Sequence, residues 1–243
     1  RGVGEPWLGE EDRTVWVRGR RRAERRRRRG AIILTTTPGG TPSPGAATDA
    51  VAEACRTEGL DVLPWGEAAE LRARLALLNR ELGEPWPAMD DGALLDRAEQ
   101  WLLPAVEALA ASGRRFDLRR LDVGAALRAL LPWPQAARLD ELAPEKLPIP
   151  SGGTRPLDWS GAHPVLTLRV QQAFGWTDTP RLLDGRVPLV LHLTDPAGRP
   201  AAVTSDLTSF WVGPYRDVRA QLRGRYPKHP WPEDPLSAEP TNR

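Results

Sequence analysis

A leucine stripe between residues 67 and 82 constrains this chain more than any other feature. Five apolar side chains recur there at spacings of three and four residues: Ala68, Leu71, Leu75, Leu78 and Leu82. This spacing brings them onto one face of an α-helix. Glu67 and Glu70 lie in the first turn and Gly83 follows the last one, as expected at helix termini. Such a face is stable only when buried, so the stripe predicts a helix in a packed core and no binding function.

The stripe lies within a longer stretch that is helical by the same criteria. Further helices are predicted over residues 46–58, after Asp90 and Asp91, over 117–131 and over 135–143. Gly59 is expected to cap the first of these, and Pro104 to end or kink the one that follows Asp91. Cys55, in the first helix, is expected to be a small buried apolar residue. Proline- and glycine-rich stretches flank the region, which predicts a helical segment over 41–146.

Residues 1–40 are predicted to form β-structure. Thr14–Val17 and Ala31–Thr37 are rich in β-branched residues. Between them, Arg18–Arg29 contains nine arginines and a single acid, Glu24. This composition fits a nucleic-acid patch or a solvated arm. It fits equally well a solvent-facing strand whose charges protect the edge of a small antiparallel sheet, and the sequence leaves both interpretations open.

Residues 147–243 are predicted to mix helices and strands. Pro164–Phe174 is predicted to be a helix, with proline at its first position and Gly175 just past its end. Residues 185–204 are predicted to form a hairpin, with a type I turn at Asp195–Gly198. Asp206 is expected to cap a short helix. A last helix is predicted over Pro214–Arg225, followed from Pro227 by an extended proline-rich tail.

The composition argues against several kinds of chemistry. One cysteine and three histidines make a disulfide framework or a Cys/His metal site unexpected. The two lysines, Lys146 and Lys228, follow Glu145 and Pro227, so neither fits the glycine-rich loop that binds nucleotide phosphates. A DEAH-like acidic box is also absent from the sequence. The chain alone is therefore not expected to hydrolyse ATP, and we assign it no catalytic residue, cofactor or metal. His192, within an alternating apolar run, is expected to be a structural histidine.

The location of the protein is constrained by equally simple features. No apolar run reaches the length of about 18 residues that spans a bilayer, and no signal-peptide pattern opens the chain. A cytoplasmic protein without a membrane partner is expected. The chain begins with Arg1 and its single methionine is Met89, so we expect it to be part of a longer product.

A basic and aromatic stretch near the end of the chain is the candidate binding site. It comprises Arg216, Arg219, Arg223, Arg225, Tyr226, Lys228 and His229. The first three lie on one face of the predicted helix, opposite Tyr215, Val218 and Leu222. Guanidinium groups for phosphates and rings for bases suit single-stranded nucleic acid. The alternative is an amphipathic helix with a solvated basic face, with Tyr226 and Trp231 packing back onto the body of the domain.

Distinctive segments occur along most of the chain. They are WGEAAELRARLALLNREL (65–82), ALLDRAEQWLLP (93–104), LDVGAALRALLPW (121–133), LDELAPEKLPIPSG (139–152), PVLTLRVQQAFG (164–175), GRVPLVLHLTDPAGRP (185–200) and LRGRYPKHPWPEDP (222–235). In this order they resemble the C-terminal region of the HrpB family of bacterial DEAH/RHA-type ATP-dependent helicases. The last segment is the most specific. The chain departs from the family pattern at Ser151–Pro156, where a proline is inserted.

The resemblance implies an α+β architecture in three parts. Residues 1–40 would be the terminal strands of a small OB-like β module, 41–146 a helical segment, and 147–243 a mixed α/β C-terminal domain. The implied role is to assist the binding of nucleic acid, expected to be single-stranded RNA, beside the motor domains of the parent helicase. ATP and Mg²⁺ would belong to that motor. The alternative role is a protein-interaction module of the same parent that contacts no nucleic acid.

Overall fold

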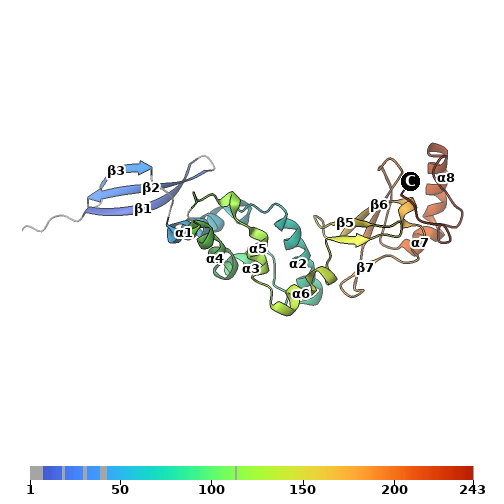
Figure 1. The fold of residues 1–243 in the computed structure, drawn as a ribbon, viewed down its shortest axis with the longest axis horizontal. Coiled ribbons are helices and arrows are strands. Elements are labelled where there is room, and N and C mark those ends of the chain that lie inside the picture. Colours follow the sequence, from blue (N-terminus) through green and yellow to red (C-terminus); the bar gives the residue numbers. More distant parts are fainter. Residues whose placement is uncertain (1–7, 18–19, 30–31, 39–42, 113, 243) are drawn as a thin grey trace, which may run out of the picture. The chain divides into compact units, whose positions relative to one another are not determined.

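The structure is a computed structural model that describes residues 8–17, 20–29, 32–38, 43–112 and 114–242, with side chains from residue 43 onward. The chain divides into two compact units, residues 1–132 and 133–243 (Figure 1). The expected division into 1–40, 41–146 and 147–243 stays a prediction. The helix expected at the end of the helical segment lies in the second compact unit.

The first unit opens with a three-stranded antiparallel sheet, in the order β1-β2-β3. Its strands are β1 (Leu8–Val17), β2 (Arg20–Arg29) and β3 (Ile32–Pro38). The arginine-rich segment is thus a strand, as one interpretation held, but it is the central strand and does not protect an edge. The expected residues Arg18 and Ala31 lie outside the described part, and the OB-like identity of the sheet stays a prediction.

The register of this sheet pairs opposite charges. The acidic positions of β1 face arginine positions of β2: Glu10 faces Arg27, Glu11 faces Arg26, and Asp12 faces Arg25. Arg13 in turn faces Glu24, the acid of the arginine-rich strand.

Five α-helices lie within residues 43–112 and 114–132 of the first unit. They are α1 (Pro44–Glu58), α2 (Ala68–Leu82), α3 (Asp91–Asp96), α4 (Ala98–Ala111) and α5 (Val123–Arg128), with single 3₁₀ turns at η1 (Leu60–Val62) and η2 (Leu118–Arg120). The two helices predicted around 46–58 and 67–82 are confirmed, with glycine following each. Among the described residues, no helix is both long and apolar enough to cross a membrane.

Pro104 does not end the third predicted helix. The helix is interrupted earlier, at Arg97, and α4 then continues through Pro104 to Ala111. A proline inside a helix costs about 3 kcal/mol. The burial of Trp101, Leu102 and Val106 in the same helix outweighs this cost, since each large apolar side chain contributes about 1.5–3 kcal/mol.

The helix predicted over 117–131 is also wrong in its extent. The structure contains the short turn η2 and the separate helix α5. Two aspartates divide the segment by accepting backbone hydrogen bonds: Asp117 from the amide of Arg119 at 3.1 Å, and Asp122 from that of Ala125 at 2.8 Å. Because aspartate favours caps over helix interiors, each begins a new turn.

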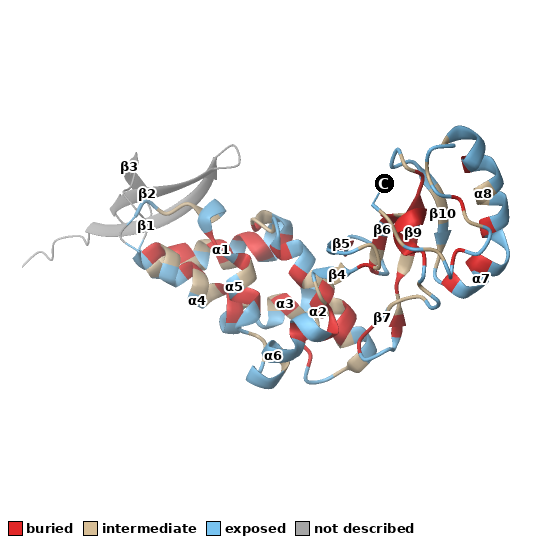
Figure 2. Ribbon diagram, turned by 45° about the vertical axis from the view of Figure 1, so that its right-hand side comes forward, coloured by how far each residue is buried: buried red, intermediate tan, exposed pale blue. Residues whose placement is uncertain are grey.

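The leucine stripe forms the core of the first unit. Ala68, Leu71, Leu75 and Leu78 are buried, and Leu82 at the helix end is half-buried. Figure 2 shows buried residues along α1, α2 and α4. Cys55 is buried, as predicted. The indole of Trp101 donates to the carbonyl of Leu94 at 2.9 Å, which fixes the ring within this core.

The second unit is built on a mixed five-stranded sheet in the order β10-β9-β6-β5-β4. Its elements are α6 (Trp133–Leu142), β4 (Lys146–Pro148), β5 (Thr154–Asp158), β6 (Val165–Arg169), η3 (Val170–Ala173), β7 (Arg181–Leu182), β8 (Val187–Pro188), β9 (Val190–Thr194), β10 (Pro200–Thr204), α7 (Leu207–Val212) and α8 (Pro214–Arg225). Strands β6 and β9 are parallel, and the other pairs are antiparallel. The predicted α+β class is confirmed.

The predicted helix over Pro164–Phe174 is wrong. The segment forms strand β6 and the 3₁₀ turn η3, with Leu166, Leu168 and Val170 buried and Thr167 exposed. This alternation has the period of two that marks a strand. The proline and glycine at its ends mimicked helix boundaries. The predicted hairpin is confirmed as β9 and β10, and its turn is closed by a 3.0 Å hydrogen bond from the Gly198 amide to the Asp195 carbonyl.

Residues in the first turn or at the cap position determine where two helices of this unit begin. Helix α6 begins at Trp133, two residues before the predicted start. Pro134 fits the first turn because an amide at this position would have no partner within the helix. Asp206 caps α7 as predicted, accepting from the amide of Ser209 at 3.0 Å.

The tail beyond α8 returns across the second unit. We call residues 227–242 the return segment; it contains no helix or strand, yet Trp231 and Pro235 are buried. The amide of Gly175 donates to the Pro235 carbonyl at 3.0 Å, and the amide of Thr241 donates to the Gln171 carbonyl at 3.1 Å. At its end, the Asn242 amide nitrogen donates to the Ser151 carbonyl at 3.0 Å.

Truncating the stripe should destabilise the first unit. Leu78→Ala is expected to lower the free energy of unfolding by about 2–5 kcal/mol, because it leaves a cavity at a fully buried position. The measurement is urea unfolding followed by circular dichroism at the helical minimum. Leu82→Ala, at the half-buried end of the same stripe, is the matched control and should cost clearly less. Equal losses for the two variants would contradict the assignment of the core.

Candidate nucleic-acid interface

Helix α8 carries the candidate site, and its inner face holds it in place. Tyr215 and Leu222 are buried and Val218 is half-buried, which confirms the predicted amphipathic helix. The ring of Tyr215 packs edge-on against Phe174 and Trp211, with centroids 6.2 and 5.2 Å apart. Its hydroxyl donates to the Pro232 carbonyl at 2.9 Å, and burial raises the pKa of the phenol to about 12. The opposite face of α8 is exposed (Figure 2).

Arg219 is engaged within the fold. Its Nε donates to the Trp231 carbonyl at 2.8 Å, and its Nη2 lies 3.3 Å from a carboxylate oxygen of Glu233. Only 20% of its side chain is exposed. The structure therefore places this predicted site residue as a clamp on the return segment.

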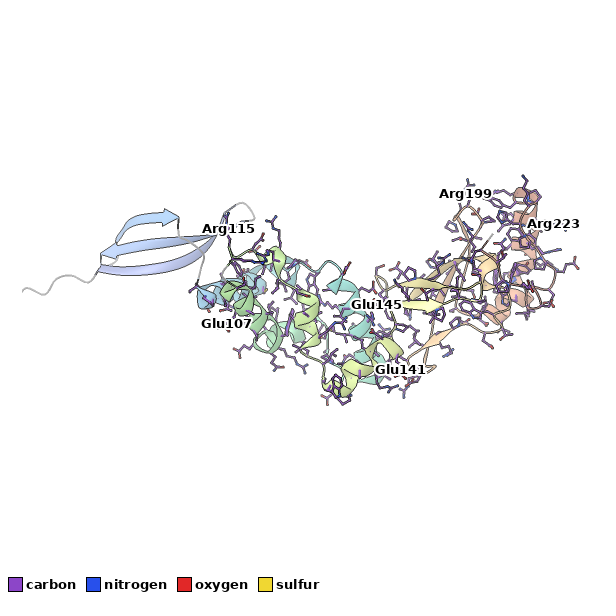
Figure 3. All side chains as sticks on the ribbon, viewed as in Figure 1. Glu107, Arg115, Glu141, Glu145, Arg199 and Arg223 are labelled. Carbon is purple, nitrogen blue, oxygen red and sulfur yellow. The ribbon has the colours of Figure 1, made fainter. Side chains whose placement is uncertain are left out.

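The other predicted cations point into solvent. Arg216 lies 3.6 Å from Asp217, but both side chains are more than four-fifths exposed, so this pair contributes little. Three further cations, Arg223, Arg225 and Lys228, are exposed. Among the residues that the structure describes, their side chains have no hydrogen-bond or ion-pair partner. Figure 3 shows the side chain of Arg223 projecting from α8.

The aromatic residues of the candidate site pack back onto the domain. Tyr226 is half-buried, and its hydroxyl donates to Oδ2 of Asp195 at 2.8 Å. Its ring meets the half-buried ring of His229 edge-on, at 6.0 Å. Trp231 is buried, and its indole donates to the Tyr226 carbonyl at 2.9 Å. The alternative interpretation of these rings is thus confirmed for Tyr226 and Trp231.

Asp195 organises the turn beside these rings. Its Oδ1 accepts from the amides of Ala197 and Arg199, each at 2.9 Å, and the residue is 2% exposed. Burial by itself would raise the pKa of this carboxyl, but the hydrogen bonds from Arg199, Tyr226 and Ala197 and the Arg199 charge leave it below its ordinary value. The hydrogen bond to Asp195, together with partial burial, raises the pKa of the Tyr226 phenol, whereas Arg199 and Arg225 lower it.

Sequence reasoning missed Arg199. This exposed arginine follows the turn Asp195–Gly198 directly, so the predicted hairpin already fixed its place in the chain. Arg199 lies near Tyr226 because the Tyr226 hydroxyl binds Asp195. No local sequence pattern predicts this contact between distant segments. His192, for which a structural role was predicted, lies on the exposed face of β9. The period of two was right, but His192 lies on the solvent side of that alternation.

The described residues contain no cluster of metal ligands, and neither lysine is placed to bind a nucleotide phosphate. Within residues 43–112 and 114–242, no three His, Cys, Asp or Glu side chains gather as metal ligands. Lys146 is the first residue of the edge strand β4, and Lys228 lies in the return segment. Neither begins a helix after a glycine-rich loop, so these residues do not fit the phosphates of ATP.

The fold and the exposed arginines define an α+β module with exposed basic side chains along α8. The sequence profile of the family HrpB_C, described as ATP-dependent helicase C-terminal, matches residues 101–235. The chain therefore belongs to the HrpB C-terminal family. It is 42% identical, over 205 residues, to the ATP-dependent RNA helicase HrpB of Escherichia coli K12; the match covers 83% of this chain and 25% of that protein.

Solved structures agree with this assignment. The crystal structure of the E. coli DExH-box NTPase HrpB matches 97% of this chain at a TM-score of 0.78 and 38% identity. A second crystal structure, of the E. coli DEAH/RHA helicase HrpB, matches 92% at a TM-score of 0.67 and 37% identity. The chain spans 30% and 29% of those two chains. It thus corresponds to a minor part of its relatives' length.

The Asp195 carboxylate should make the stability of the second unit depend on pH. Its pKa in the folded state is below the ordinary 3.8, so its contribution is present above that pH and is lost as the pH falls through the folded value. Asp195→Asn should therefore be less stable than the natural chain at pH 6, and the difference should shrink towards pH 3. Urea unfolding followed by tryptophan fluorescence measures it.

The difference in stability between the natural chain and Asp195→Asn reports on the Asp195 carboxylate alone. Asp158, Asp206 and Asp234 in the same unit also have lowered pKa values, so the natural chain alone would lose stability in acid in any case. A stability difference between the natural chain and Asp195→Asn that stays constant from pH 6 to pH 3 would contradict the assigned role.

Proposed function

We propose that this chain is the accessory region of an ATP-dependent RNA helicase of the HrpB type and that it binds single-stranded RNA through α8. The membership of the family supports the parentage, because the E. coli relative is named an ATP-dependent RNA helicase. The proposed role places the protein in the bacterial cytoplasm, beside the motor domains of its parent. Those domains would bind ATP and Mg²⁺ and supply the energy of unwinding.

The observation that carries the proposal is the set of unpaired cations at the end of α8. Arg223, Arg225 and Lys228 are exposed and lack carboxylate partners among the described residues, and Arg216 has only a weak neighbour. Unpaired guanidinium groups neutralise phosphates and release the counterions bound to a nucleic acid. The fold uses one arginine of this helix for its own structure and leaves the others available.

The mechanism that follows is mechanical. The buried face of α8 and the clamp formed by Arg219 fix the helix against the domain. The cations on the opposite face are therefore carried by a rigid element, so they can track a phosphate backbone without ordering a loop on binding. The chain contributes binding and orientation, and no bond-breaking step is assigned to its residues.

A protein-interaction module remains the second candidate, and a specific observation favours it. Val212 at the end of α7 is 87% exposed, and Trp133 at the start of α6 is 82% exposed. Tryptophan is among the residue types enriched where proteins contact one another. The two roles differ in their response to salt, because apolar contacts lack the steep salt dependence of phosphate binding.

The binding of RNA should depend on salt and on the outer face of α8. Fluorescence anisotropy with a short labelled single-stranded RNA is expected to show an affinity that falls steeply with salt. Arg216→Ala combined with Arg223→Ala should weaken binding and reduce the slope of log K against log salt by about 0.7 for each phosphate that is no longer neutralised. Both changes lie on exposed side chains and should leave the melting temperature unchanged.

Two controls sharpen this test. Arg186→Ala removes the same charge from an exposed loop of the same unit and should leave the affinity unchanged. Arg219→Ala should instead lower the melting temperature, because it releases the return segment. Absence of RNA binding, or binding that is insensitive to salt and to the Arg216/Arg223 changes, would reject the nucleic-acid role in favour of the protein-interaction module.

A further inference from the structure

One carboxylate joins two basic segments that are far apart in the sequence. Oδ1 of Asp195 accepts from the backbone amide of Arg199 at 2.9 Å, and Oδ2 accepts from the hydroxyl of Tyr226 at 2.8 Å. Arg199 follows the turn between β9 and β10, and Tyr226 directly follows Arg225, the last residue of α8. The hydrogen bonds of Asp195 therefore fix the hairpin turn to the C-terminal end of α8.

The two arginines beside this junction are available to a ligand. Arg199 and Arg225 are exposed, and no side-chain hydrogen bond or ion pair holds either of them among the described residues. Both lie close enough to the Tyr226 hydroxyl for their charges to lower its pKa. Figure 3 shows that the side chains of Arg199 and Arg223 extend from the turn and from α8 respectively.

Asp195 binds backbone amides and a hydroxyl and not the two guanidinium groups. The residue is 2% exposed, and its oxygens accept from two backbone amides and one hydroxyl. The charge of Arg199 attracts the carboxylate, but neither arginine side chain hydrogen-bonds to it. An external anion therefore meets exposed guanidinium groups beside a buried acid.

We propose that Arg199 and Arg225 form a two-pronged site for a backbone phosphate of single-stranded RNA, and that Tyr226 is the positioning residue that holds the two prongs together. This inference rests on the proposed function and extends its surface from α8 to the hairpin turn. Arginine suits this task because its planar fork matches phosphate oxygens. A phosphate that contacts both arginines bridges the two elements.

The site recognises phosphates and not bases. Trp231 is buried, and the Tyr226 ring is packed edge-on against His229 with its hydroxyl bound to Asp195. Burial withholds the Trp231 ring from a base, and the hydroxyl of Tyr226 and the contact with His229 hold the Tyr226 ring against the domain. The affinity of the site is therefore independent of base identity, and an oligonucleotide that lacks bases binds as well as one that has them.

The test measures RNA binding by anisotropy for the natural 243-residue chain and for three variants: Arg199→Ala, Tyr226→Phe and the double variant. Arg199→Ala should weaken binding by roughly fivefold and reduce the salt slope by about 0.7, the effect of leaving one phosphate without its cation. Tyr226→Phe keeps the ring and every cation, so it should weaken binding with little change of slope. Because Tyr226 acts through the prongs, the double variant should bind no more weakly than Arg199→Ala alone.

The outcomes separate this inference from the proposed function. If the natural chain binds no RNA, the proposed function fails. If it binds, and the Arg216/Arg223 variant is weaker while Arg199→Ala behaves like Arg186→Ala, the two-pronged site is overturned and the function of α8 stands. A Tyr226→Phe effect of equal size with and without Arg199 would show a merely structural role for Tyr226. A strong preference for an RNA over an abasic strand of the same length would refute recognition through phosphates alone.

Discussion

The parallel pairing of β6 with β9 is the constraint on which the second unit depends. Parallel neighbours cannot be joined by a tight turn, so the chain between them carries η3 and the small β7–β8 hairpin before it returns. The pairing buries Leu166 beside Leu191 and Leu168 beside Leu193. With β9 fixed between β10 and β6 in the sheet, the residue that follows it, Asp195, is fixed as well. The tie between the hairpin turn and α8 is thus a consequence of sheet topology.

The arginines of α8 show that similar residues on one helix can have different physical roles. Arg219 lies one turn from Arg223 and belongs to the same basic stripe, yet it binds a backbone carbonyl and is four-fifths covered. Arg223 has no such partner in the described part of the chain. What separates them is the path of the return segment, which passes Arg219 and leaves Arg223 in water. A basic stripe in a sequence therefore overstates the charge that a folded surface offers to a ligand.

The elements with a long, regular period could be predicted from the sequence, as could those with a clear cap. The leucine stripe of α2, the cap at Asp206 and the two faces of α8 are of this kind, because local spacing alone determines them. Strand β6 could not be recognised by its boundaries, since Pro164 and Gly175 are equally good helix signals, and tertiary pairing with β9 decided the outcome. Arg199 and the clamp on Arg219 depend on interactions between distant segments, which no local pattern encodes. The sequence predicted that basic residues gather near the C-terminal end of the chain. Only the fold shows which of them bind within the domain and which remain exposed.

The return segment has a consequence for how this unit acquires its structure during synthesis. Its last described residue, Asn242, binds Ser151 and Gln172, which lie 91 and 70 residues earlier in the chain, and Trp231 is buried in the interior. A chain that emerges from the ribosome with its N-terminal end first lacks these interactions until the return segment is free. The contacts of the second unit are complete only when residues as far as Asn242 have left the ribosome. A ribosome that stalls within the last turn of α8 would therefore hold a second unit that lacks every interaction of the return segment.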